Sequence, residues 1–291
     1  MSESQAGSLP PVAAHLAVPS IARVYDYLLG GTTNWEVDRQ FAHRMLDEYP
    51  VMRRIALMQH RFAARVVRWL CSEGVYQFLD IGAGVPSVGA THELADDAWG
   101  AARSQRDCRV IYVDNDPVAV AHAQLALDHW GDRRRHGVVE ADLRAPDELW
   151  QQVVDMELFD FDQPVAVLLI GVLHLQQLDA DGHEIGPDSV WKLRERMPLG
   201  SYVAFSHVTH EGIPTRLRAK LAGLKRFYDA SENPVVCRSR SEIEALLGHF
   251  EMVSPGWSAA NNWQAGDQEN DDPWRGSPST AVLWAGVGKK V

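Results

Sequence analysis

Two carboxylates with a glycine turn between them are the residues of this chain most suited to bind a ligand. Asp80 and Asp114 each end a short apolar run, and Asp80 is followed at once by a turn containing Gly82 and Gly84. An apolar strand, a glycine loop and a second strand ending in Asp form a nucleotide crevice at the carboxyl edge of a parallel sheet. The pattern therefore predicts that the glycines let a ligand approach the backbone and that Asp114 accepts hydrogen bonds from ribose hydroxyls.

The position of Asp80, two residues before the first glycine, indicates which nucleotide-like ligand would bind. A carboxylate there would repel a pyrophosphate and would hold the ammonium group of an amino acid. S-adenosylmethionine (SAM) carries both a ribose and such an ammonium, so we predict that SAM is the cofactor. On this interpretation the protein is a SAM-dependent methyltransferase.

A dinucleotide site is the first alternative, and it would make the protein an NAD(P)-dependent oxidoreductase. The dinucleotide fingerprint needs a third glycine, but Ser87 stands at that position and Pro86 precedes it. Asp114 also lies farther along than the spacing of about 20 residues that such sites show. A non-catalytic SAM-binding module is the second alternative.

Further cofactor contacts are expected where the next strands end. Asn115 lies beside Asp114 and is available to the adenine, and Leu143 could line the base. Asp142 follows a third apolar run, where it could hold the adenine amino group or merely cap the next helix. Gly171 ends a fourth run and is expected beside the cofactor as well, because the carboxyl ends of central strands face the ligand crevice.

Histidines near two strand ends are candidates for proton transfer from an acceptor, with a structural role as the alternative for each one, and at least one of them is expected in the pocket. His174 follows the fourth run, and His207 ends the fifth. An imidazole that titrates near neutral pH suits the removal of a proton from a hydroxyl, amine or ring nitrogen. Tyr25 is a further catalytic candidate, and His210 is assigned to the substrate side.

Tryptophan is abundant, with 10 residues, and some lie where they could stack on a flat substrate. Trp257 and Trp263 fall in a long polar loop near the carboxyl terminus, as does Trp274, and Trp35 lies near the amino terminus. The alternative for each is ordinary packing of the loop on the core. No metal site is predicted, and His183 and Glu184 are assigned to a turn.

Composition restricts the partners. The 291 residues are 46% hydrophobic and carry a formal net charge of -11, with a pI near 5.5. Binding to nucleic acid or to an anionic membrane needs clustered Lys and Arg, so neither partner is expected. The charge favours a neutral or cationic small-molecule acceptor. Three separated cysteines form no zinc or disulfide pattern, and we expect a cytoplasmic protein; a homodimer is left open.

The elements that must position these residues follow from periodicity. Residues 1–19 read as a flexible tail, 20–70 as a helical cap and 71–291 as a core in which strands and helices alternate. Helices are expected near 21–29, 34–49, 52–70, 91–104, 117–129, 146–154, 189–197, 214–230 and 241–247. Strands are expected at 77–80, 109–114, 137–140, 165–170 and 202–207, followed by an antiparallel pair at 250–253 and 280–287. The loop 254–279 between that pair is expected to lack regular structure.

The chain also resembles a family of actinobacterial SAM-dependent methyltransferases long catalogued as a domain of unknown function. The resemblance rests on the segment 22–31 with Asn34, Asp38 and Arg39, and on the segments 78–82, 112–117, 141–144, 168–174 and 200–207. It implies an α/β, doubly wound, mostly parallel seven-stranded sheet of the class I methyltransferase type with an amino-terminal helical cap. It further implies that Arg23, Tyr27 and Gly31 cover the bound cofactor, with Arg23 pairing with its carboxylate; the alternative is a cap helix whose Tyr residues pack and whose Arg is solvated.

The predicted function is transfer of a methyl group from SAM to an O, N or C nucleophile of a small molecule. An aromatic or indole-like natural product of secondary metabolism is the expected acceptor, on the ground of the tryptophan content. Substrate choice is expected to reside in the loop around Trp263 and the acidic segment 267–272.

Overall fold

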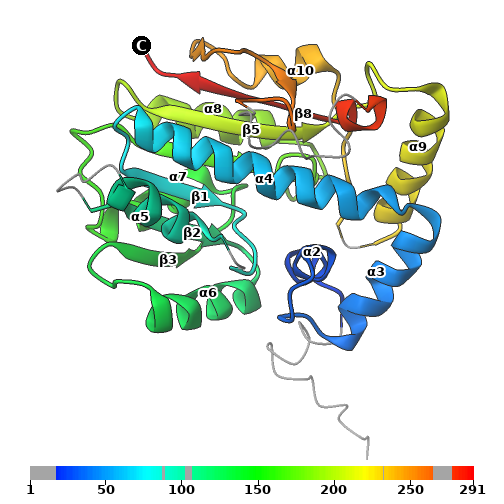
Figure 1. Ribbon diagram of the computed structural model, residues 1–291, viewed down its shortest axis with the longest axis horizontal. Coiled ribbons are helices and arrows are strands. Elements are labelled where there is room, and N and C mark those ends of the chain that lie inside the picture. The colour runs from blue at the N-terminus through cyan, green and yellow to red at the C-terminus, as the bar shows by residue number, and fades with distance from the viewer. Residues whose placement is uncertain (1–17, 87–88, 102–106, 232, 265–276) are drawn as a thin grey trace, which may run out of the picture.

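The structure is a computed structural model that describes residues 18–86, 89–101, 107–231, 233–264 and 277–291. An eight-stranded sheet runs through its centre in the order β3-β2-β1-β4-β5-β8-β6, with β7 also paired to β8 (Figure 1). The strands are β1 (Gln77–Ile81), β2 (Arg109–Asp114), β3 (His136–Glu140), β4 (Ala166–Ile170), β5 (Tyr202–Val208), β6 (Glu251–Met252), β7 (Ser258–Ala259) and β8 (Leu283–Lys289).

The first five strands are parallel, and β8 runs antiparallel to its neighbours β5, β6 and β7. Because β1 lies between β2 and β4, the carboxyl ends of these three strands meet at one edge, and the chain reverses its direction of winding there. The predicted doubly wound α/β fold and its closing antiparallel pair are confirmed. The sheet has one strand more than the seven predicted.

The extra strand, β7, is a two-residue pairing with β8 inside the segment expected to lack structure. So short a strand has no period of its own, and only its hydrogen bonds to β8 define it. A 3-10 helix, η2 (Pro278–Val282), likewise takes up the start of the predicted last strand. The prediction for the rest of that loop, residues 265–276 with Trp274 and the acidic segment, and for tail residues 1–17 lies outside the described residues.

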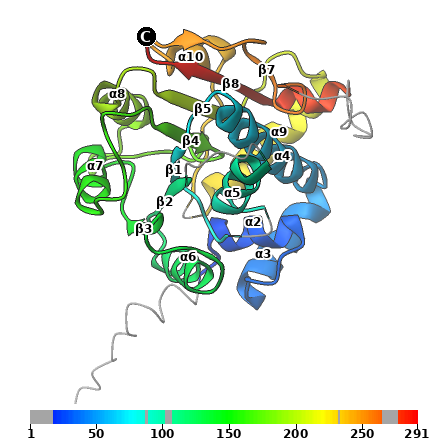
Figure 2. The ribbon, with the colours of Figure 1, turned by 60° about the vertical axis from the view of Figure 1, so that its left-hand side comes forward.

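Helices cover both faces of the sheet (Figure 2). On one face lie α4 (Val51–Ser72), α5 (Thr91–Ala101) and α6 (Pro117–Trp130), and on the other lie α7 (Pro146–Asp155), α8 (Gly186–Arg196) and α10 (Arg240–Ala245). Successive strand residues therefore point into different cores: Phe78 packs on the first face and Leu79 on the second. This two-sided burial explains why the strands are almost continuously apolar in sequence.

The amino-terminal helices α2 (Ile21–Leu29) and α3 (Glu36–Glu48) pack beside α4, and α9 (Thr215–Asp229) lies at the same end of the molecule (Figure 1). The long helix α4 contacts both β4 and β8, and its Phe62, Val66 and Leu70 are fully buried in the core shared with the sheet. As a result, α2 lies against α4 and over the carboxyl ends of the strands. No helix of the described ranges combines the length and the apolar character that crossing a membrane requires.

Candidate functional site

A cavity of about 510 Å³ opens at the carboxyl ends of β1, β2 and β4. This volume lies within the range of about 300–1,000 Å³ that is usual for small-molecule sites. One side of the cavity is formed by the strand ends and the turns after them, and the other side by α4, α9 and the segments 174–177 and 233–237. Ser20, Ala22, Tyr25 and Leu28 of α2 and its start complete the wall.

Asp80, next to last in β1, lines the cavity. Its carboxylate accepts a hydrogen bond of 2.6 Å from the Thr91 hydroxyl at the start of α5. Burial raises the pKa of Asp80 to about 6, and the nearby Asp114 carboxylate adds to this, against the hydrogen bond from Thr91. A buried carboxylate held in this way is suited to a cationic ligand, because a bound ammonium would offset the cost of its charge.

The glycine turn brings the second carboxylate to the same wall. Gly82 and Gly84 have φ values of 68° and 65°, which side chains rarely adopt. The turn places the Gly84 N–H 2.8 Å from Oδ2 of Asp114, and the Asp116 N–H lies 2.9 Å from Oδ1. Each oxygen of Asp114 therefore accepts one backbone hydrogen bond and keeps a further lone pair, so both can accept from a ribose. Burial raises the pKa of Asp114.

The predicted adenine contacts come together on the next strand end. Asn115, Asp142 and Leu143 all line the cavity, and the Asn115 amide donates to Asp142 at 3.2 Å. Asp142 also accepts from both the backbone and the guanidinium of Arg144. Burial alone would raise the pKa of Asp142, but the hydrogen bonds from Arg144 and Asn115 hold it below its usual range. Asp142 is thus charged, partly paired, and still open to the cavity.

The end of β4 supplies Gly171 and His174, which also line the cavity. A Cβ at Gly171 would overlap the side-chain amide of Gln59 on α4, so this glycine lets helix and strand end approach each other. Burial, with a contribution from the Arg238 guanidinium, lowers the pKa of His174 to about 4. His174 is therefore neutral at pH 7, and it can accept a hydrogen bond from a substrate O–H or N–H.

Tyr25 of α2 lines the cavity near Asp80. Its hydroxyl donates to the carbonyl oxygen of Ala56 at 3.1 Å. Burial raises its pKa above the usual range, and the Asp80 carboxylate adds to the rise. The phenol therefore stays protonated, and it can donate a hydrogen bond but cannot serve as a base.

The structure does not bring the other amino-terminal candidates to the cavity. The Arg23 guanidinium is completely buried, 2.7 Å from Asp38 and 3.8 Å from Asp116, and it stacks 4.0 Å from the Trp35 ring. It thus joins α2 to α3 and to the turn after β2, and Trp35 covers it. Neither Arg23 nor Trp35 lines the cavity.

Tyr27 and Gly31 likewise contact other residues of the amino-terminal helices and do not line the cavity. The Tyr27 hydroxyl lies 2.6 Å from Nε2 of His43 on α3, on the side of α2 away from the cavity. A Cβ at Gly31 would overlap the Asp26 carboxylate, and Asn34 donates both to that carboxylate and to the Gly31 carbonyl. The signature at residues 22–34 therefore builds the turn from α2 to α3.

His207 and His210 also lie away from the cavity lining. His207 is fully buried behind it, with Nδ1 2.8 Å from the Val208 carbonyl and Nε2 2.7 Å from the Arg238 guanidinium and 3.0 Å from the Leu173 carbonyl. A neutral ring with its proton on Nδ1 donates to Val208 and accepts from Arg238, which itself donates to the Leu173 carbonyl at 2.6 Å. Burial, together with His174 and Arg238, lowers the pKa of His207 to about 3, so it holds structure instead of exchanging protons. His210 is exposed after β5.

Trp257 and Trp263 of the long loop pack on the core, as their alternative interpretation holds. Trp263 is fully buried against Phe62 and Trp69, with ring centroids 5.5 and 5.6 Å away. Trp257 stacks on Phe205 at 6.3 Å. Neither ring lines the cavity, so the structure does not support their assignment to the substrate.

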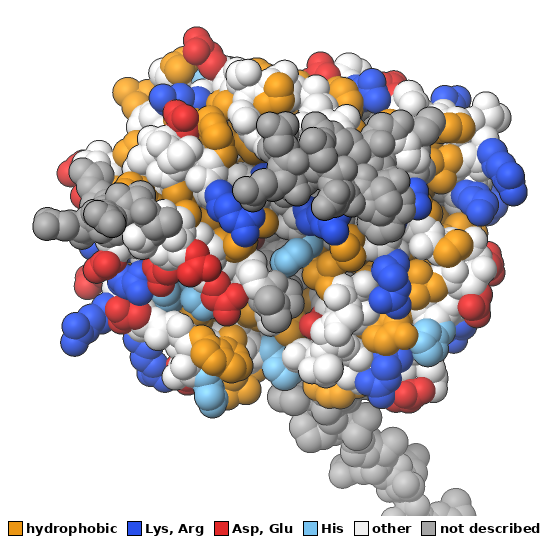
Figure 3. Space-filling model, in the orientation of Figure 1, with side chains coloured by type: hydrophobic (Ala, Val, Ile, Leu, Met, Phe, Trp, Pro, Cys, Tyr) orange, Lys and Arg blue, Asp and Glu red, His pale blue; other side chains and the backbone are white. Residues whose placement is uncertain are grey.

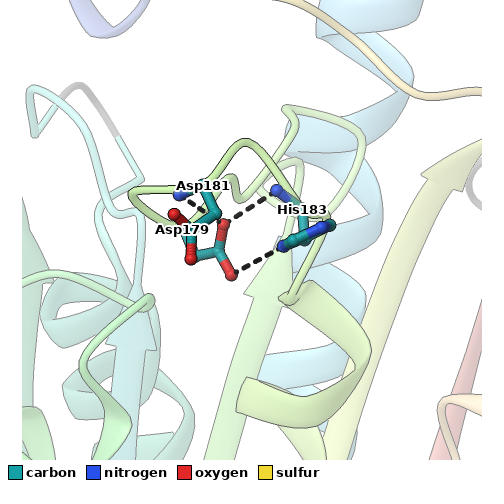
Figure 4. A group of neighbouring side chains, drawn as sticks. All are labelled: Asp179, Asp181 and His183. Carbon is teal, nitrogen blue, oxygen red and sulfur yellow. Dashed lines mark hydrogen bonds and ion pairs between the residues drawn. The ribbon is translucent and has the colours of Figure 1, made fainter.

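A cluster of three side chains of the types that bind metal ions lies outside the cavity, on the surface turn predicted around His183. Asp179, Asp181 and His183 each offer a ligand atom, within 4.8 Å of one another (Figure 4). Asp179 accepts from the backbone N–H groups of Asp181 and His183 at 2.9 and 2.8 Å. These hydrogen bonds account for the arrangement as a turn.

Several cavity residues were missed by sequence analysis. They are Ser20, Met52, Gln59, His60, Thr91, Asp116, Lys225, Tyr228 and Cys237. Most lie on helices or long connections, where only the three-dimensional fold shows which side faces the cavity. Asp116 could have been found, because it stands two residues after Asp114, and it accepts a 2.5 Å hydrogen bond from the Ser20 hydroxyl.

Comparison with known proteins agrees with this geometry. The sequence profile of the S-adenosyl methyltransferase family matches residues 11–291. A crystal structure of a DUF574 family protein from Streptomyces avermitilis is 28% identical, with a TM-score of 0.81, and the match covers 94% of this chain and 98% of that one. Among proteins of curated function, none has a sequence that matches this chain.

Two further structures extend the likeness. A candidate methyltransferase from Thermobifida fusca is 31% identical, with a TM-score of 0.79 and coverage of 98% and 99% of the two chains. The magnesium protoporphyrin IX methyltransferase of Synechocystis with bound S-adenosylhomocysteine (SAH) is 13% identical, with a TM-score of 0.51 and coverage of 92% and 93%. At that identity the likeness shows the fold alone.

Proposed function

The chain belongs to the S-adenosyl methyltransferase family and is a SAM-dependent enzyme, and from this premise we propose that it methylates an O, N or C atom of a small molecule. One observation carries the proposal: residues suited to the cofactor and residues suited to an acceptor line a single cavity. We call the side bearing Asp80, Gly82, Gly84, Asp114 and Asp142 the nucleotide half. The acceptor half is the opposite side, formed by Leu28 of α2, by α4 and α9 and by the segments 174–177 and 233–237, and it bears Met52, Gln59, His174, Leu224, Lys225 and Val235.

The residues present suit the cofactor. Asp80 is buried with a raised pKa, as expected for a carboxylate whose cationic partner is a ligand. Asp114 keeps lone pairs on both oxygens for two hydroxyls, and Asn115 and Asp142 offer polar groups to the base. We therefore assign the ammonium to Asp80, the ribose to Asp114 and the adenine to the group of Asn115, Asp142 and Leu143.

Catalysis then depends mainly on alignment. SAM supplies a methyl group already activated by the sulfonium. The chain's task is to hold the nucleophile in line with that methyl, and alignment of this kind can lower a barrier by about 7–11 kcal/mol. Asp80, Asp114 and Gly171 form one side of the site, and α2, α4 and α9 contribute the walls of the other.

His174 is the group that we assign to orientation of the acceptor. It stands at the end of β4, where the two halves of the cavity meet, and it is neutral. Its imidazole can accept a hydrogen bond from the reacting hydroxyl or amine, and it can take the proton that such a group releases after the methyl has moved. A pKa near 4 makes it a weak base, which suits a proton that leaves late, from an already methylated and acidic group.

The apolar residues of the cavity wall, and not the tryptophans, are the argument for an aromatic acceptor. Trp35, Trp257 and Trp263 lie elsewhere, but Leu28, Met52, Ile55, Leu221, Leu224 and Val235 give the acceptor half an apolar lining. Such a lining fits a flat or aliphatic carbon skeleton. An aromatic natural product, methylated in the cytoplasm, remains our proposal for the acceptor.

The test separates cofactor from chemistry. Isothermal titration with SAM, SAH and NAD should give binding of the first two and none of the third. Transfer of a labelled methyl group from SAM to a panel of phenols, indoles and amines should then be lost in His174→Gln, while SAH affinity is kept. NAD binding without SAM binding would overturn the proposal, and SAM binding with no transfer to any nucleophile would favour the non-catalytic module.

A further inference from the structure

We propose that the methyl acceptor is an apolar small molecule that carries a carboxylate, and that Lys225 of α9 binds this carboxylate. The inference rests on the proposed function, because it assigns the chemistry of the second ligand of the same cavity. It departs from the neutral or cationic acceptor that the net charge of -11 favours.

The negative charge of the cavity is confined to the nucleotide half. Asp80, Asp114, Asp116 and Asp142 are the carboxylates among the described residues that line the cavity, and all four follow or end β1, β2 and β3. A cationic acceptor would therefore meet no carboxylate among the described residues of the acceptor half. The overall acidity of the protein does not extend to the surface that the acceptor contacts.

Lys225 is the position where a charge does enter the acceptor half. The cavity-facing residues of α9 are Leu221, Leu224, Lys225 and Tyr228, whose spacing places them on one face of the helix. Apart from Lys225 this face is apolar or phenolic. The other basic side chains of α9 are exposed and do not line the cavity: Arg216, Arg218, Lys220 and Arg226. Lys and Arg side chains are visible over α9 at the right-hand edge of Figure 3.

The ammonium of Lys225 remains able to receive a ligand. Its Nζ donates to Oδ2 of Asp229 at 2.6 Å, and the two side chains are 38% and 37% exposed. An ion pair so open to solvent contributes little to stability. An ammonium carries three N–H donors, so a ligand carboxylate can join Asp229 or replace it.

The other titratable groups of the acceptor half do not compete for an anion. Burial lowers the pKa of both His60 and His174, with Arg61 and Arg238 adding to the respective effects. Both imidazoles are therefore neutral at pH 7 and offer hydrogen bonds without charge. Cys237 also lines the cavity near Lys225, and burial keeps it a thiol by raising its pKa. Lys225 is thus the cation among the described residues of the acceptor half.

Matched ligands that differ only in charge test the assignment. The SAH-saturated protein is titrated with indole-3-acetate, 2-naphthoate and octanoate, with the amide of each acid, and with tryptamine as the cation. We expect at least one acid to bind about 5-fold more tightly than its amide, the gain that one partly exposed ion pair provides. Lys225→Gln should bring the acid down to the affinity of its amide and leave the amide unchanged.

Lys220→Gln is the matched control, because it removes the same charge from the same helix outside the cavity. It should leave the preference for the acid intact. An equal loss of the preference for the acid in both variants would mean that the preference comes from the summed positive charge of α9. That result would overturn the assignment. So would tighter binding of tryptamine than of indole-3-acetate, or a panel in which no acid binds above its amide. Failure of SAH itself to bind would count against the proposed function instead.

Discussion

The two halves of the cavity are built in different ways. The nucleotide half consists of residues at or just after the carboxyl ends of parallel strands, and its carboxylates accept hydrogen bonds from the neighbouring turns and from the start of α5. The acceptor half draws on α2, α4, α9 and two long connections, and it is mainly apolar. In our proposal the strand ends hold the cofactor, and the helices and connections opposite them select the acceptor.

The strongest test of this comparison asks whether Arg23 belongs to the nucleotide half or only to the scaffold behind it. Arg23→Ala leaves Asp38 buried without its 2.7 Å partner, and loss of one member of a buried pair costs about 3–5 kcal/mol. We expect a fall of that size in the free energy of unfolding, measured with urea. SAH affinity of the folded fraction should change little.

Arg133→Ala is the control for Arg23, because its pair with Asp128 is largely exposed and contributes about 1 kcal/mol or less. A stable Arg23→Ala protein with lost SAH binding would contradict the structural role and restore Arg23 to the cofactor site.

Asp114→Ala should weaken SAM binding, and it should also lower the free energy of unfolding, because Asp114 accepts hydrogen bonds from the backbone N–H groups of Gly84 and Asp116. Its carboxylate is the proposed ribose acceptor, and leaving buried donors unpaired costs about 1–3 kcal/mol, or roughly 5- to 150-fold in SAM affinity. Isothermal titration measures the loss. Unchanged affinity would reject the ribose assignment.

The charge of Asp80 predicts a pH dependence for cofactor binding. Its pKa of about 6 in the free protein means that the carboxylate is charged at pH 7 and mostly protonated at pH 5. A bound ammonium favours the charged form, so SAM affinity should be full above about pH 7 and fall as the pH drops, by about tenfold between pH 7 and 5. Asp80→Asn should bind SAM weakly with a flat profile over this range. A flat profile in the unaltered protein would contradict the assignment.

The smallest effect is expected from a substitution across the cavity. Met52→Ala shortens an apolar side chain of the acceptor half, so SAH affinity should stay within about 2-fold of the unaltered protein. Affinity for naphthamide-like apolar probes should fall. An equal loss for SAH would show that the two halves are not separable.

The sequence predicts the position of a site residue well where the residue stands at the end of a strand. Side chains at the carboxyl ends of parallel strands must meet at one edge, so the sequence alone predicts that Asp80, Asp114, Asp142, Gly171 and His174 lie together. Their presence in one cavity agrees with those assignments, and their roles stay predictions.

The positions of some helical residues were not predicted correctly, because spacing along a helix does not show which side faces the cavity. Arg23 and Tyr27 are four residues apart on α2, yet one is buried against Asp38 and the other meets His43. A helix enclosed on several sides has more than one buried face, and spacing does not tell which face meets the ligand. For the same reason Lys225 could not be distinguished in sequence from the exposed basic residues around it.

The start of α2 is tied to the turn after β2. The Ser20 hydroxyl donates to Asp116, whose own N–H donates to Asp114, and Ala22 packs beside Gly84. Any ligand that stabilises this turn also stabilises the position of α2. By thermodynamic linkage, a ligand that stabilises the position of α2 must also stabilise the turn. The enzyme would then take up its two ligands cooperatively, with the donor preparing the chamber into which the acceptor enters.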